Sequence, residues 1–194
     1  MTTEEFIDGI SSLVSEGTRE KLYQSIRERP NGVFVEVGTY MGGTLFRMAH
    51  FAKKNNIPMK FYAVDTFTYE NISFQQKEID SLAHNAAPVS YYEIYQHNLS
   101  ESNLSRDVIT LKMDSMDAVD KFDDESIDVL FLDGCHGYPY TKNEILAWLP
   151  KVRIGGIILG HDFKDCGDVQ RAAREALGEI QTTPENESYY WVKS

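Results

Sequence analysis

Short apolar runs alternate along the chain with longer segments of helical hydrophobic period. After Gly43, the apolar residues Leu45, Met48, Ala49 and Ala52 recur at i, i+3, i+4 and i+7 and form one face of a helix. The apolar runs predict five strands, at residues 33–37, 61–64, 108–111, 127–132 and 157–159. The helical patterns predict helices at residues 18–29, 43–54, 140–149 and 169–177.

This alternation predicts βαβ units around a parallel sheet. Two short strand-like pieces, 179–183 and 188–192, predict a closing antiparallel hairpin. We expect an α/β, Rossmann-like, doubly wound and mostly parallel sheet of seven strands with that C-terminal hairpin. Residues 1–30 are expected to form an N-terminal helical extension and residues 31–194 the main domain. Residues 66–104 are expected to hold a polar loop and then two helices that separate near Pro88.

Charge and composition limit the classes of partner. The net charge is −11, which disfavours binding to phosphate backbones and anionic lipids. No apolar run approaches the ~20 residues that span a bilayer. The acidic N-terminus is unlike a signal peptide, and two isolated cysteines do not make a disulfide scaffold. We therefore expect a cytoplasmic protein with no nucleic-acid or membrane partner.

The first candidate site is a glycine-rich turn between the first strand and its helix. It runs from Glu36 to Thr44 and includes Gly38 and Tyr40. Glycines allow the backbone to approach a ligand closely, and the helix N-terminus offers free amides. The turn lacks the Gly-x-Gly-x-x-Gly of dinucleotide sites. Glu36 would repel a pyrophosphate but suits an amino group or a sulfonium.

Two further candidates follow the second and third strands. Asp65 ends the second strand, where a carboxylate can accept both ribose hydroxyls of a nucleoside. Asp114 and Ser115 follow the third strand. They could bind an adenine edge, and they could equally cap a helix.

A cluster of acidic and histidine residues follows the fourth and fifth strands. Asp133 and His136 follow the fourth strand, and His161 and Asp162 follow the fifth. Two carboxylates at one edge of the sheet suit Mg²⁺ or Ca²⁺, and His136 is placed to act as a general base. A zinc cluster that adds Cys135, Asp165 and Cys166 is the weaker alternative, because the spacing matches no paired Cys/His pattern.

These segments together resemble class I S-adenosylmethionine (SAM)-dependent O-methyltransferases. The glycine turn resembles that of catechol O-methyltransferase. The segments Phe-Leu-Asp-Gly-Cys-His-Gly-Tyr and Gly-Gly-Ile-Ile-Leu-Gly-His-Asp resemble the macrocin and mycinamicin sugar O-methyltransferases and their cephalosporin-pathway relatives. The resemblance covers residues 18–194 and identifies 31–194 as the methyltransferase domain.

The resemblance implies a role for each candidate. The methionine part of SAM would lie among Glu36, Gly38, Tyr40 and Thr44, the ribose at Asp65, and the adenine near Asp114 and Ser115. Asp133 would take part in catalysis and would contact both the cofactor and a divalent metal. Asp162 would bind the same metal, and His136 would be the general base. His161 departs from the family, whose metal-binding members often place an oxygen ligand beside the second aspartate. A nitrogen ligand there would favour a softer metal than Mg²⁺.

The resemblance leaves the acceptor open. It implies a hydroxyl of a sugar or other polyhydroxylated small molecule, with a catechol-like phenol next, and a homodimer is an expectation only. The alternatives are a methyltransferase that needs no metal, a non-catalytic SAM or nucleotide sensor, and an NAD-dependent oxidoreductase. The sensor has no need for Asp133, His136 and Asp162 together. The polar segment Thr66–Lys77 is expected to act as a lid.

Overall fold

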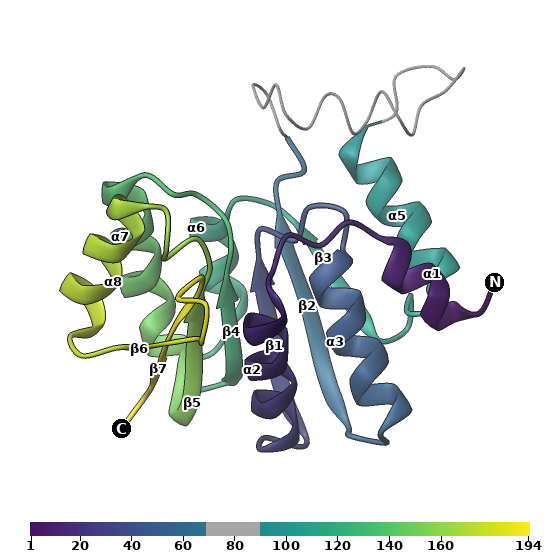
Figure 1. Ribbon diagram of the computed structural model, residues 1–194, viewed down its shortest axis with the longest axis horizontal. Coiled ribbons are helices and arrows are strands. Elements are labelled where there is room, and N and C mark those ends of the chain that lie inside the picture. The colour runs from purple at the N-terminus through teal and green to yellow at the C-terminus, as the bar shows by residue number, and fades with distance from the viewer. Residues whose placement is uncertain (69–89) are drawn as a thin grey trace.

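The computed structural model describes residues 1–68 and 90–194, and its centre is a single seven-stranded sheet (Figure 1). The strand order is β3-β2-β1-β4-β5-β7-β6. The strands are β1 (Gly32–Val37), β2 (Met59–Asp65), β3 (Val108–Lys112), β4 (Ile127–Leu132), β5 (Val152–Gly160), β6 (Gln181–Thr182) and β7 (Tyr189–Val192).

Strands β1 to β5 pair in parallel, whereas β7 pairs antiparallel with both β5 and β6. This arrangement confirms the expected doubly wound sheet with a C-terminal hairpin. The order reverses between β1 and β4, and ligands of such sheets bind outside the carboxyl ends of the strands at that point.

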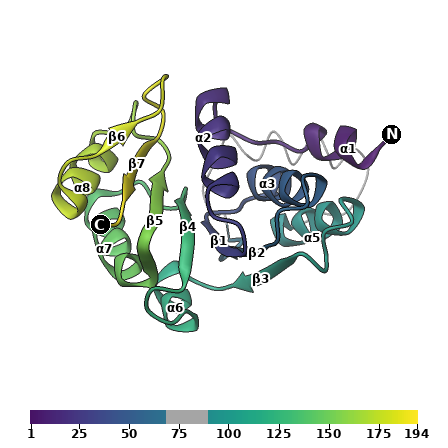
Figure 2. The same ribbon diagram turned by 90° about the horizontal axis from the view of Figure 1, so that it is seen from below.

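Helices cover both faces of the sheet. Figure 2 shows α1, α2, α3 and α5 on one side and α6, α7 and α8 on the other. Alternate residues of each strand serve the two layers: Phe34 packs in the first core and Val35 in the second. The helices are α1 (Thr3–Gly9), α2 (Glu16–Arg27), α3 (Gly43–Lys54), α5 (Tyr91–Glu101), α6 (Ser115–Ala118), α7 (Tyr138–Trp148) and α8 (Gly167–Leu177).

The observed elements differ from the expected ones mainly at their ends. Helix α2 begins at Glu16 because Ser15 caps it, and α1 is an additional helix, with a capping box formed by Thr2 and Glu5. Strand β5 begins at Val152, well before the predicted start, because a register shift against β4 accommodates Gly155 at φ +77°. The helix expected before Pro88 and most of the expected Thr66–Lys77 lid lie outside the described residues.

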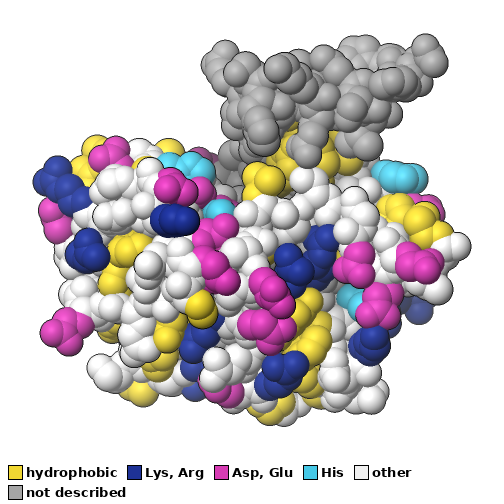
Figure 3. Space-filling model, viewed as in Figure 1, with side chains coloured by type: hydrophobic (Ala, Val, Ile, Leu, Met, Phe, Trp, Pro, Cys, Tyr) yellow, Lys and Arg dark blue, Asp and Glu magenta, His cyan; other side chains and the backbone are white. Residues whose placement is uncertain are grey.

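The surface of the described residues agrees with the acidic composition. Figure 3 shows Asp and Glu side chains interspersed with Lys and Arg over one face, without a large basic cluster on that face. None of the helices in residues 1–68 and 90–194 is long and apolar enough to cross a membrane.

Candidate functional site

A cavity of about 750 Å³ lies at the carboxyl edge of the sheet. Every residue that the resemblance places on the cofactor, the metal or the reacting group lines it. These residues are Glu36, Gly38, Tyr40, Thr44, Asp65, Asp114, Ser115, Asp133, His136, His161 and Asp162. The sheet topology therefore gathers candidates from five strand ends into one chamber.

The turn between β1 and α3 needs glycine at Gly38. Its φ is +86°, and a Cβ there would collide with the backbone carbonyl of Asp133. Tyr40 also adopts a left-handed conformation, at φ +53°. The turn thereby passes close to the β4–α7 loop and leaves the N-terminus of α3, which has no side-chain cap, at the cavity.

Glu36 is the most unusual side chain of the cavity. It is 1% exposed, and its Oε2 has no hydrogen-bond partner among the described residues. Burial, with the nearby carboxylates of Asp133 and Asp65, raises the pKa of Glu36 well above its usual range. A buried acceptor of this kind costs stability unless a ligand supplies a donor or a positive charge.

Asp65 holds the glycine turn from the neighbouring strand. Its Oδ2 accepts the backbone N–H of Tyr40 at 2.8 Å, and its Oδ1 accepts the N–H of Phe67 at 2.7 Å. Asp65 also lines the cavity, and a carboxylate at the end of this strand is the type of group that accepts ribose hydroxyls. Asp65 is thus both a brace for the turn and a candidate ribose ligand.

Asp114 and Ser115 have structural bonds at the other end of the cavity. Asp114 caps α6 by accepting the N–H of Met116 at 2.8 Å, and it also accepts the Tyr140 hydroxyl at 3.0 Å. Ser115 accepts the Trp148 indole N–H at 2.9 Å. Capping and cavity lining coexist, so the two interpretations of these residues are compatible.

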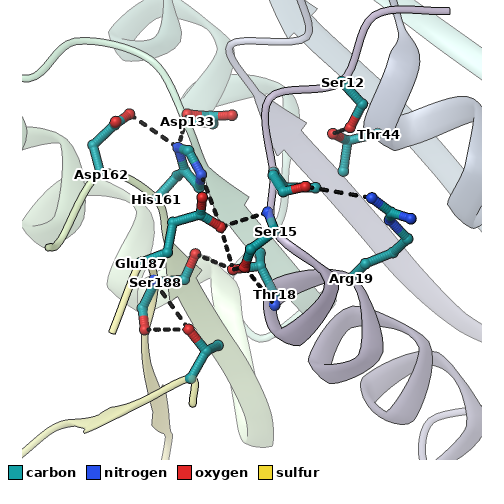
Figure 4. A network of polar contacts seen from close by, with 12 residues as sticks. Ser12, Ser15, Thr18, Arg19, Thr44, Asp133, His161, Asp162, Glu187 and Ser188 are labelled. Carbon is teal, nitrogen blue, oxygen red and sulfur yellow. Dashed lines mark hydrogen bonds and ion pairs between the residues drawn. The ribbon is translucent and has the colours of Figure 1, made fainter. Parts of the chain in front are cut away.

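Asp133, His136, His161 and Asp162 form one connected cluster. His136 Nε2 lies 2.8 Å from Asp162 Oδ2. His161 Nδ1 lies 3.2 Å from Asp133 Oδ1 and 3.0 Å from Asp162 Oδ2 (Figure 4). One ligand atom from each of Asp133, His136 and Asp162 lies within 4.8 Å of the others. The metal ligands predicted from the sequence are Asp133, Asp162 and His161. In the structure, the three residues whose ligand atoms lie this close together are Asp133, Asp162 and His136.

The charges of the cluster are strongly coupled. The hydrogen bond to Asp162 raises the pKa of His136, and bonds from both histidines hold the pKa of Asp162 well below its usual range. Burial acts to lower the pKa of His161, but its bonds to Asp133 and Asp162 outweigh burial and raise the pKa to about 11. Burial raises the pKa of Asp133. His161 is therefore a buried cation between two carboxylates.

Neither cysteine belongs to the set of three possible metal ligands. Cys135 is exposed, and Cys166 Sγ lies 3.5 Å from the His136 carbonyl oxygen. The geometry gives the zinc alternative no support from sulfur.

Sequence reasoning missed several residues that line the cavity. Ser11, Ser12 and Leu13 reach it from the segment between α1 and α2, Glu187 from the β6–β7 hairpin, and Glu144 from α7. In the segment between α1 and α2, only Ser15, which caps α2, carries a local signal, and it does not itself line the cavity. The other contacts are long-range.

Comparison with known proteins agrees with this architecture. A family model described as a methyltransferase domain matches residues 35–163. The uncharacterised protein y4gI of Sinorhizobium fredii is 29% identical over 135 residues, which cover 69% of this chain and 13% of that protein. The chain thus spans about 13% of the length of this curated relative.

Solved structures share the fold. The O-methyltransferase NovP superposes with a TM-score of 0.72 at 19% identity, covering 100% of this chain and 88% of NovP. CalS11, a TDP-rhamnose 3'-O-methyltransferase of calicheamicin biosynthesis, superposes with a TM-score of 0.60 at 16% identity, covering 98% of this chain and 90% of CalS11. A SAM-dependent O-methyltransferase of Thermotoga maritima superposes with a TM-score of 0.60 at 14% identity, covering 98% of this chain and 70% of that protein. Because the family model spans most of the chain, from the glycine turn to β5, this protein belongs to the SAM-dependent methyltransferase domain family.

Proposed function

We propose that this protein transfers the methyl group of SAM to a hydroxyl of a sugar or other polyhydroxylated small molecule, with help from a divalent metal. One observation carries the proposal: the buried carboxylate of Glu36, whose Oε2 has no hydrogen-bond partner among the described residues, and the Asp133–His136–Asp162 set line the same cavity. A cofactor-binding end and a proton-accepting end are thus within one chamber.

The cofactor end suits SAM in its chemistry. SAM, when bound, supplies a methyl group on a positively charged sulfur that leaves as a neutral thioether. Glu36 would bind the amino group, and Asp65 would accept hydroxyls of the ribose. Asp114 and Ser115 would lie beside the adenine. The abundance of carboxylates in the cavity favours a cofactor that carries a sulfonium and an ammonium group.

The metal fits the donor set. Asp133 and Asp162 offer carboxylate oxygens, which Mg²⁺ prefers. A divalent ion bound there would supply Lewis acidity that lowers the pKa of an acceptor hydroxyl. Asp133 and Asp162 would then orient the acceptor beside the cofactor.

His136 would take the proton from the acceptor hydroxyl at Nδ1, because its Nε2 donates to Asp162 Oδ2. Its side chain is about half exposed within the cavity wall, and Asp162 holds the ring by its 2.8 Å contact. A positioned general base typically contributes ~10²–10⁴-fold to the rate. The structural similarity to CalS11, a methyltransferase of a sugar hydroxyl, supports the choice of acceptor class.

The first test is calorimetric titration with S-adenosylhomocysteine (SAH), once with Mg²⁺ and once with chelator. We expect micromolar binding, followed by methyl transfer from labelled SAM to hydroxylated acceptors. His136→Ala should keep its SAH affinity and lose ~10²–10⁴-fold in turnover. His97→Ala, on α5 against Phe6, is the matched control. The absence of SAH binding in both conditions would refute the proposal.

A metal-independent methyltransferase is the second candidate, and His161 favours it. Its protonated ring contacts both Asp133 and Asp162 and already neutralises part of their charge. In that case the carboxylates and His136 position the acceptor without an ion. Turnover that is unchanged by chelator would select this candidate.

A further inference from the structure

A short N-terminal arm, residues 10–15, crosses the edge of the cavity and is held at both ends. At the α3 end, the Ser12 and Thr44 hydroxyls lie 2.9 Å apart, and Arg47 donates to the Ile10 carbonyl at 2.9 Å. At the other end, Glu187 Oε2 accepts the Ser15 backbone N–H at 2.6 Å (Figure 4). The arm is therefore a fixed wall of the cavity.

The two anchors belong to different parts of the site. Thr44 follows the glycine turn that carries Glu36 and Gly38, so this anchor is at the end proposed for the methionine part of SAM. Glu187 lies 3.4 Å from His161 Nε2, and His161 contacts the two carboxylates of the cluster (Figure 4). The middle of the arm therefore lies between the cofactor end and the proton-accepting end.

Leu13 occupies that middle position and is 55% exposed. It is the one large exposed apolar side chain among the described residues that lines the cavity. The other large apolar residues with exposed side chains lie elsewhere; they are Met1, Ile109, Met116, Leu146, Ile154 and Val192. The polar side chains that line the cavity near the cluster include His136, Asp162 and Lys164.

We propose that Leu13 is a specificity-determining residue that selects acceptors with an apolar face beside the reacting hydroxyl. The inference rests on the proposed function, since it places the acceptor between the arm and the carboxylate cluster. Hydroxyls of the acceptor face Asp133, Asp162 and His136, and its apolar face packs on Leu13. The shared chemistry is a vicinal diol on a ring that also presents apolar surface, as in a 6-deoxyhexose or an aromatic diol.

The test measures acceptor binding to the full protein loaded with SAH and Mg²⁺. The apolar-faced probes are methyl α-L-rhamnopyranoside, by calorimetry, and 4-nitrocatechol, by its absorbance change. Methyl α-L-mannopyranoside differs from the rhamnoside by one added hydroxyl and is the polar counterpart. The variants are Leu13→Ala, Leu13→Met and the control Leu146→Ala, which removes an exposed leucine on α7 away from the cavity.

We expect at least one apolar-faced probe to bind. If the natural acceptor is a sugar, the rhamnoside should bind more tightly than the mannoside. Leu13→Ala should weaken that probe about tenfold through lost apolar contact. Leu13→Met should restore most of the affinity, and Leu146→Ala should change nothing. SAH affinity should stay within about twofold throughout, because Leu13 is not among the residues placed on the cofactor.

Two results would overturn the inference while leaving the proposed function intact. In the first, SAH binds but neither apolar-faced probe does. In the second, the probes bind and Leu13→Ala changes their affinity no more than it changes that of the mannoside. Failure of SAH itself to bind would instead refute the proposed function. If only one of the two apolar-faced probes binds, that probe shows whether the acceptor is a deoxy sugar or an aromatic diol.

Discussion

Replacing Glu144 with glutamine should stabilise the protein at neutral and alkaline pH. Glu144 lies on α7, is 2% exposed, and its Oε1 has no hydrogen-bond partner among the described residues. Burial raises the pKa of Glu144 to about 7, although a hydrogen bond from Ser115 acts to lower it. Above that pH the folded protein holds a buried carboxylate that water would solvate better.

The magnitude follows from the linkage between protonation and folding. An unfolded glutamate has a pKa of about 4.3, and the difference from the folded value corresponds to about 3–4 kcal/mol at most. The folded state binds more protons than the unfolded state between these two pKa values. This group therefore contributes a loss of stability as pH rises from about 4.5 to about 7.

Thermal unfolding of the ligand-free protein at pH 5 and pH 8 separates the cost of ionising Glu144 from any other effect of the substitution. Glu144→Gln should gain about 1–3 kcal/mol at pH 8, roughly 2–4 °C in midpoint per kcal/mol, and little at pH 5. Glu175→Gln is the control, because bonds to Lys142, Tyr138 and Arg171 hold the pKa of Glu175 at about 2, and its loss should destabilise the fold. An equal shift of Glu144→Gln at both pH values would refute the reasoning.

Three other changes test separate parts of the site. Glu36→Ala should weaken SAH binding roughly 10–100-fold by calorimetry, as expected for one charge-assisted hydrogen bond, and unchanged affinity would remove Glu36 from the cofactor site. Gly38→Ala should cost about 1–3 kcal/mol or more in urea unfolding, since its Cβ meets the Asp133 backbone at positive φ; Gly167→Ala, with open space around it, is the control. Asp162→Asn keeps a residue that tolerates the φ of +54° and should abolish Mg²⁺ stimulation of methyl transfer; persistent stimulation would exclude Asp162 as a ligand.

The strands and the contents of the cavity were predictable because of one property of parallel sheets. Asp65 and Asp133 each follow an apolar run, and the carboxyl ends of parallel strands meet at one edge. Knowing where each strand ended was therefore enough to place these carboxylates together. The predicted ends of β2, β3 and β4 agree with the observed ends to within one residue.

The parts that escaped prediction depend on contacts between distant residues. Glu187 binds Ser15 across 172 positions of sequence, and no local pattern marks either residue for the other. Glu144 lies on the face of α7 that also buries Thr141, Ile145 and Trp148, so its burial depends on tertiary packing. Helix α1 begins at a capping box formed by Thr2 and Glu5, which is a pattern visible in the sequence. The helix is too short to show a clear hydrophobic period, so the capping box alone did not predict it.

His161 shows most clearly why residue type alone could not define the site. The sequence places it beside Asp162, which predicts proximity to one carboxylate but not the orientation of either ring nitrogen. In the fold, Nδ1 faces Asp133 and Asp162, while Nε2 faces Glu187, which also holds Ser15 of the arm. The same imidazole therefore touches the carboxylate cluster and the residue that anchors the wall carrying Leu13. A histidine in this position links the charge of the cluster to the placement of the arm, which an oxygen ligand, having no second nitrogen to present to Glu187, would not do.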